Sequence, residues 1–217
     1  MGFIVKNTTL FSPLDLIAPH TCRGCGVLGE VLCDCCKNNI VLANGNFRPE
    51  IELPFTFFAV GSRNSILGEL INDYKYNSTR ALGVKLAEIL DETLPNFDGE
   101  INIVPLPTIS RHVRERGFDH TLFIAKRLAK IRGKEYTVSS IMERDKNSVQ
   151  VGTDRITRLV QAESAYALSP KTKINPEATY LLFDDVFTTG ASMKAAAKKL
   201  QQAGANKIVM AVLALSQ

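Results

Sequence analysis

The chain has 217 residues, of which 45% are hydrophobic, with a formal net charge of +4 at pH 7 and a pI near 8.8. This length and apolar content suffice for one α/β domain with a small appendage, and they exclude a wholly disordered chain. The basic excess is compatible with anionic ligands but is too small to indicate nucleic-acid binding by itself, and no apolar stretch is long enough to cross a bilayer.

The amino-terminal residues predict a protein that is neither exported nor inserted into a membrane. The start MGFIVKNTTLF lacks the basic region and the sustained hydrophobic segment of a signal peptide. We therefore expect the protein to be cytoplasmic, which is a reducing environment for its cysteines.

The five cysteines all lie between positions 22 and 36, as two CxxC pairs with Cys35 beside the last member. Two such pairs in a reducing cytoplasm are typical of tetrahedral zinc rather than of disulfides. A segment this small needs a metal to fold, and four protein ligands leave no position for a substrate, so we predict structural zinc. Free or redox-active thiols and an iron–sulfur cluster are the alternatives. Cys35 competes for the fourth position, but the spacing favours the set Cys22, Cys25, Cys33 and Cys36.

A linker at positions 44–46, followed by two prolines, predicts a boundary between a zinc module at residues 1–45 and a second domain at residues 46–217. In the second domain, apolar runs predict strands and helical spacing predicts helices. The predicted strands are 55–61, 101–106, 136–141, 180–185 and 208–215, and the predicted helices are 63–76, 79–93, 118–131 and 193–203. Strands that alternate with helices predict a doubly wound, mostly parallel sheet.

The segment from Tyr180 to Gly204 predicts a phosphate-binding turn at the carboxyl edge of that sheet. We expect its strand to end at Asp184 and Asp185, which can accept hydrogen bonds from a ribose diol or hold Mg²⁺ through water. Free N–H groups at the following helix start, with nearby hydroxyls, can bind a phosphate. The residues of this turn are Thr188, Thr189, Gly190, Ala191 and Ser192. The alternatives are an ordinary strand end with a helix cap, or a Walker B strand, although the chain has no GxxxxGK[ST] loop.

The sequence LLFDDVFTTGAS at 181–192 resembles the phosphoribosyl pyrophosphate (PRPP) motif of type I phosphoribosyltransferases. Over nearly its whole length the chain also resembles the ComF family of competence proteins. That resemblance lies in VPLPTISRHVRERGFDH at 104–120, INDYKYN at 71–77 and the cysteine cluster after LDLIAP. It implies a type I phosphoribosyltransferase fold that binds Mg²⁺ and PRPP.

A second phosphate-binding loop is expected after the strand that ends near Val104, because the carboxyl ends of parallel strands share one edge. By resemblance this loop grips the pyrophosphate, and its candidate residues are Pro107, Thr108, Arg111 and Arg116. Lys75, with Tyr74 and Tyr76 beside it, is a further candidate contact for the ligand. The alternatives are an ordinary proline loop with solvated arginines, and packing tyrosines with a solvated lysine.

The charged segment 142–165 predicts a flap over the ligand or a plain connector. Family members look similar at Gln150, Arg158 and the pair Ala165-Tyr166. The chain departs from the family at Asp119-His120, where RGFNQ is commoner, and at Ser192, which replaces a frequent threonine. We expect His120 to be a capping or surface residue and assign it no catalytic role; the alternative is a titrating group near the pyrophosphate loop.

Three functions are compatible with these expectations. By resemblance, the first is a ComF-type competence protein that binds Mg²⁺ and PRPP and acts in DNA uptake, with single-stranded DNA and a helicase as partners. The second is an active phosphoribosyltransferase of nucleotide metabolism with an unknown acceptor, and the third is a PRPP sensor without turnover. Basic residues gather between 111 and 134, which is more typical of a solvated helix face than of a DNA-binding surface.

Overall fold

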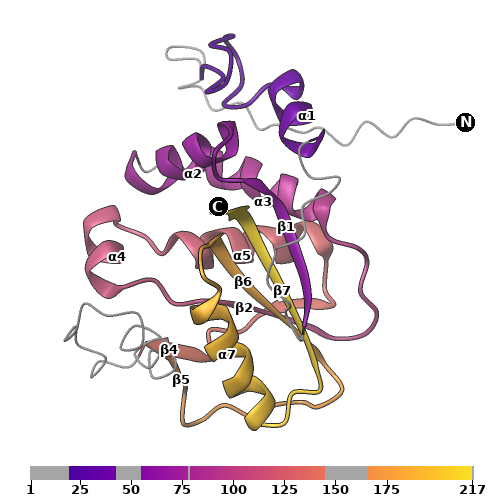
Figure 1. Ribbon diagram of the computed structural model, residues 1–217. Helices are drawn as coiled ribbons and strands as arrows, with labels where there is room; N and C mark the ends of the chain where they lie inside the picture. The colour runs from indigo at the N-terminus through magenta and orange to yellow at the C-terminus, as the bar shows by residue number, and fades with distance from the viewer. Residues whose placement is uncertain (1–19, 43–54, 78, 145–165, 217) are drawn as a thin grey trace, which may run out of the picture.

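The computed structural model describes residues 20–42, 55–77, 79–144 and 166–216. At its centre is a five-stranded sheet in the order β1-β7-β6-β2-β3, in which all neighbouring strands are parallel (Figure 1). The strands are β1 (Thr56–Ser62), β2 (Ile101–Pro105), β3 (Tyr136–Val138), β6 (Thr179–Phe187) and β7 (Lys207–Leu215). The predicted α/β class with a parallel sheet is therefore confirmed.

The central strands β6 and β7 are apolar runs that are covered on both faces, as strands of a parallel sheet usually are. The prediction that β6 ends at Asp184 and Asp185 was wrong, because the strand continues to Phe187. Val186 and Phe187 pair with Ala214 and Leu215 of β7, so the ladder extends past the acids. The two carboxylates therefore lie within the last part of the strand, at the carboxyl edge of the sheet.

Three helices cover one face of the sheet, namely α2 (Ile66–Tyr76), α3 (Arg80–Thr93) and α5 (His120–Arg132). Ser65 caps α2 by accepting a hydrogen bond from the backbone N–H of Leu67, and Asp119 caps α5 by accepting one from Leu122. The apolar faces predicted from helical spacing are buried against the sheet: Leu67, Leu70, Ile71 and Tyr74 of α2, and Leu82, Leu86, Ile89 and Leu90 of α3.

The opposite face of the sheet is covered by α7 (Ala191–Gln202) and a small antiparallel pair, β4 (Met142–Arg144) with β5 (Tyr166–Leu168) (Figure 1). Met193, Ala196 and Leu200 of α7 pack in one core cluster with residues of β6 and β7. Both faces of the sheet are therefore covered by helices, with the β4–β5 pair beside α7 on the second face. The first three residues of the predicted flap form β4, whereas 145–165, with Gln150, Arg158 and Ala165, lie outside the described residues.

The cysteine segment and α1 (Asp34–Leu42) pack against α2, α3 and β1. Leu32 and Ile40 are buried in the same core cluster as α2 and α3, and Arg23 Nε lies 2.8 Å from Asp73 Oδ2 of α2. The predicted domain boundary at 45/46 falls outside the described residues. In the described part of the chain, no helix has the length and apolar character needed to span a membrane.

Candidate functional site

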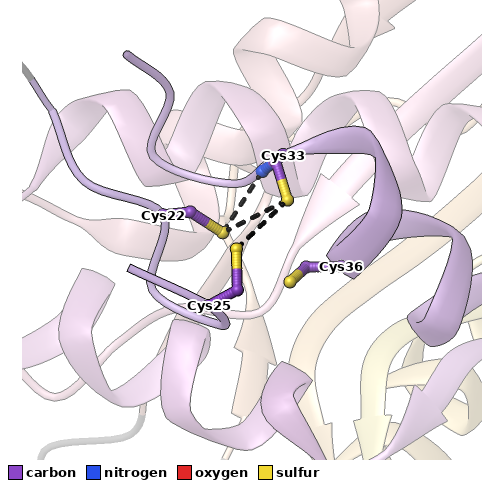
Figure 2. Close-up of side chains that lie close together, drawn as sticks. All are labelled: Cys22, Cys25, Cys33 and Cys36. Carbon is purple, nitrogen blue, oxygen red and sulfur yellow. Dashed lines mark hydrogen bonds between the residues drawn. The ribbon is translucent and has the colours of Figure 1, made fainter. Parts of the chain in front are cut away.

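Four of the five cysteines point their sulfur atoms at one another (Figure 2). The Sγ atoms of Cys22, Cys25, Cys33 and Cys36 all lie within 4.8 Å of one another, and Cys33 Sγ is 3.6 Å from both Cys22 Sγ and Cys25 Sγ. Tetrahedral zinc with Zn–S bonds of about 2.3 Å requires sulfur atoms about 3.8 Å apart. This donor set could hold a metal ion such as zinc. Cys35 is exposed and outside the cluster, so Cys36 is the fourth member, as the spacing predicts.

Local geometry favours the thiolate form of Cys22 within the cluster. Cys22 and Cys25 lie in a turn closed by a 2.8 Å hydrogen bond from the Gly26 N–H to the Cys22 carbonyl, and the Cys33 N–H donates to Cys22 Sγ. Burial raises the pKa of the Cys22 thiol, but backbone N–H groups from Cys33, Cys25 and Gly24 outweigh it and lower the pKa to about 6. Burial and the neighbouring thiols raise the pKa of Cys36. A divalent cation would relieve the repulsion among four thiolates.

A second candidate site is a cavity of about 270 Å³ at the carboxyl edge of the sheet. It brings together side chains that are far apart in the chain: Lys75 of α2, the turn after β2, His120 of α5, the acids of β6 and the first turn of α7. The expectation that the turn after β2 shares an edge with the two acids is confirmed. The lining residues are Lys75, Leu106, Pro107, Thr108, Ile109, His112, Arg116, His120, Arg144, Tyr166, Asp184, Asp185 and Ser192.

Asp185 is the buried anion of this cavity. Its Oδ2 atom accepts hydrogen bonds from Lys75 Nζ, at 2.6 Å, and from His120 Nε2. Burial raises the pKa of this carboxyl, but the hydrogen bond from His120 and the charge of Lys75 outweigh that effect and lower the pKa to about 2. Asp185 is therefore ionised at neutral pH. Lys75, expected as a ligand contact or a solvated side chain, is largely buried as its partner.

The pKa of Asp184 is shifted in the opposite direction from that of Asp185. Burial, followed by the charge of Asp185, raises its pKa to about 8, although its Oδ1 atom accepts the N–H of Asp185 at 2.8 Å. Asp184 is therefore mostly protonated at neutral pH. With Lys75, Arg116 and Arg144 in the lining against one ionised acid, the cavity carries a positive excess that favours anionic ligands.

The expectation that His120 is a capping or surface residue was wrong. Asp119 caps α5, and His120 is the buried first residue of that helix. Because α5 begins beside the acidic end of β6, the ring reaches Asp185 on one side and Thr108 and Arg116 on the other. The contact of His120 with Asp185 was not predicted, because the two residues are remote in sequence.

Some of the other predicted site residues line the cavity, and the rest do not. Ser192, Pro107, Thr108 and Arg116 line the cavity. Thr188 and Thr189 are exposed, and neither they nor Gly190 and Ala191 line it. Arg111 does not line it either, because its side chain is 77% exposed and pairs with Glu115 at 2.7 Å. Tyr74 is a packing residue that contacts Phe118 and Phe123, whereas Tyr76 is exposed.

Arg144 is a lining residue that the sequence pattern did not single out. Its guanidinium lies 5.5 Å from the ring centroid of Tyr166, which pairs with it across β4 and β5. The residue stands in a charged segment without periodicity, so no local signal marks it. The short helix α4 (Ser110–Arg116), which follows the turn after β2, was also not predicted.

Comparison with known proteins yields no match to a family model and no match to a curated protein.

Proposed function

We propose that the protein binds PRPP together with Mg²⁺ in the cavity at the carboxyl edge of its sheet, on a phosphoribosyltransferase-type fold. One observation carries the proposal: a turn after β2, the start of α7 and a pair of acids converge on one cationic cavity. PRPP presents a ribose diol and two anionic groups, and this cavity is lined by two acids together with Arg116, Thr108 and Ser192, which can bind phosphate.

Each part of the ligand has a matching group. The first turn of α7, with Ser192, suits the 5-phosphate because helix N-termini carry free N–H groups and a partial positive charge. The turn of Pro107 and Thr108, with Arg116, suits the pyrophosphate, since a guanidinium can bind two phosphate oxygens. Asp184 and Asp185 suit the ribose diol.

The acids also fit Mg²⁺, whose usual ligands are carboxylates, waters and substrate phosphates. Asp185 is already bonded to Lys75 and His120, so Asp184 is the acid more readily available to a hydrated ion, which would displace its proton. When bound, Mg²⁺ neutralises charge on the pyrophosphate. The four-cysteine cluster holds a separate, structural ion, which we propose to be zinc.

In the cell, we propose a role as a ComF-type competence protein that acts in DNA uptake with a helicase partner. The resemblance described in the sequence supports this role, and the basic excess of the chain is compatible with it. If single-stranded DNA is a partner, its binding weakens steeply as salt rises, because phosphate contacts release counterions. The absence of measurable binding at low salt would remove this part of the proposal.

Calorimetry tests the proposed ligand. The parent is titrated with PRPP with and without Mg²⁺, beside Asp184→Asn, Asp185→Asn and the control Asp98→Asn, which changes an exposed acid. Loss of either cavity acid is expected to weaken binding about tenfold or more, because Asp185→Asn removes an ionised acceptor and Asp184→Asn removes the acid that Mg²⁺ would bind in place of its proton. If both variants bind like the parent, the assignment of the acids is wrong. A second assay incubates the protein with Mg²⁺, PRPP and a panel of bases and measures the release of pyrophosphate. A transferase releases pyrophosphate with at least one base, whereas a sensor binds PRPP without releasing it.

A further inference from the structure

His120 is enclosed by polar groups from several elements. Its Nε2 atom bonds Asp185 Oδ2 of β6, and its Nδ1 atom lies 3.0 Å from Arg116 Nη1 and 3.2 Å from Thr108 Oγ1. The backbone carbonyl of His120 accepts the hydroxyl of Tyr74 at 2.9 Å. With 5% of its surface exposed, the ring has little room to turn.

These partners determine which ring nitrogen carries the proton. A guanidinium can only donate, so Nδ1 accepts from Arg116. Thr108 Oγ1 donates its one proton to Asp119 Oδ1 at 3.1 Å, so it gives no hydrogen bond to Nδ1 and does not decide the tautomer. Because Nδ1 accepts from Arg116 and the Asp185 carboxylate can only accept, the proton of a neutral ring lies on Nε2 and is donated to Asp185. The guanidinium of Arg116 also lies over the ring of Tyr76, with its Cζ atom 5.3 Å from the ring centroid.

We propose that His120 is a positioning residue: Arg116 holds it as the Nε2–H tautomer, and it in turn fixes the carboxylate of Asp185 for the ligand. Lys75 donates to the same oxygen of Asp185, so the two donors together set the direction of the carboxylate. The arrangement links two parts of the cavity lining, because Arg116 is the last residue of α4 and Asp185 lies near the end of β6.

The tautomer can be tested without any ligand. Long-range ¹H–¹⁵N correlation of the full-length protein at pH 7.5 reports the proton position on each of its three histidines, and His120→Gln identifies the signals of His120. We expect the Nε2–H pattern in the parent and a mixture of tautomers in Arg116→Met. An Nδ1–H pattern or a doubly protonated ring in the parent would overturn the proposal, as would an unchanged pattern in Arg116→Met.

The positioning role rests on the proposed function and is tested by the affinity for Mg²⁺ and PRPP. His120→Gln keeps an amide donor near the place of Nε2 and is expected to bind within about threefold of the parent. His120→Ala removes the donor to a charged acceptor and is expected to bind about ten- to a hundredfold more weakly. The control is His20→Ala, which changes a half-buried histidine that does not line the cavity, and thermal unfolding confirms that each variant is folded.

The outcomes separate the two proposals. If His120→Ala binds like the parent, or if the Gln and Ala variants lose affinity equally, the positioning role is refuted. If the parent itself binds no PRPP, the proposed function fails, whereas the tautomer measurement still decides whether Arg116 orders His120 and His120 donates to Asp185.

Discussion

Lys75 Nζ of α2 lies 2.6 Å from Asp185 Oδ2 of β6, and both side chains are largely shielded from solvent. The two preceding residues of α2 make contacts in other directions. Asp73 pairs with Arg23 of the cysteine segment, and the Tyr74 hydroxyl donates to the carbonyl of His120. Three consecutive residues of one helix therefore connect the cysteine cluster, the start of α5 and the acid of the cavity.

Lys75→Met is expected to lower the free energy of unfolding by about 3 kcal/mol, because removing one partner leaves a buried charge uncompensated. Urea unfolding measures the change. The matched control is Lys85→Met, which removes a more exposed pair with Glu88 and is expected to cost less than about 0.5 kcal/mol. Equal effects of the two substitutions would show that the Lys75–Asp185 pair contributes no more than a surface pair.

The cysteine cluster predicts one bound metal ion per chain. Elemental analysis is expected to find the ion in the parent and in Cys35→Ser, whose thiol is outside the cluster, but not in Cys22→Ser. Loss of the ion is expected to lower the thermal midpoint of Cys22→Ser by several degrees, since binding energy at such a site is also folding energy. Full metal content in Cys22→Ser would contradict the assignment of its ligands.

Removal of the metal is expected to loosen α2. Leu32 and Ile40 of the cysteine module pack in the same core cluster as Leu67 and Ile71 of α2, so a disordered module would expose that side of the helix. Hydrogen exchange after chelation is expected to quicken in residues 66–76 and to stay unchanged in residues 191–202, which form α7 on the opposite face. Unchanged exchange in α2 would mean that the module does not support the helix.

Gly190 is expected to resist substitution for two reasons. Its φ is +71°, which disfavours side chains, and a Cβ there would lie 2.2 Å from Cζ of Phe187. Gly190→Ala is therefore expected to cost at least about 1 kcal/mol more in urea unfolding than Gly204→Ala, where φ is +103° and nothing lies within 4 Å of the added atom. Phe187→Leu is expected to recover part of that difference. Equal costs at the two glycines would show that the ring yields freely.

The raised pKa of Asp184 predicts a pH dependence of stability. Between its ordinary pKa of 3.8 and about 8, the folded protein holds a proton that the unfolded chain releases, so this group lowers the free energy of unfolding as pH rises. The lowered pKa of Asp185 acts in the opposite sense, but only below its ordinary value of 3.8.

Urea unfolding from pH 5 to pH 8 separates these effects. The decline over this range is expected to be smaller in Asp184→Asn than in the parent by about 1.4 kcal/mol or more, which corresponds to one pKa unit. Asp98→Asn, which changes an exposed acid, serves as the control and is expected to follow the parent. Parallel curves for Asp184→Asn and the parent would show that Asp184 titrates at its ordinary pKa.

Much of the fold was predictable because its signals are local. Helical spacing located the buried faces of α2 and α3, and apolar runs located the strands of the parallel sheet, since each pattern reports the period of one element. The end of β6 was misplaced because the acids looked like a terminus, whereas pairing of Phe187 with Leu215 of a remote strand extends the ladder. The residue at which a strand ends is therefore determined by pairing with a neighbouring strand, which can be remote in the sequence.

By itself the sequence determined which four cysteines form the cluster and that two acids lie at the edge of the sheet, because CxxC spacing and strand-to-helix turns are short-range features. Only the tertiary structure decided that Lys75, His120 and Arg144 join those acids in one cavity, and that Arg111 does not. Whether each of these side chains reaches the cavity depends on where its helix or strand lies relative to β6. The placement of these elements is set by packing between segments distant in the chain, and a residue pattern within one element carries no information about it.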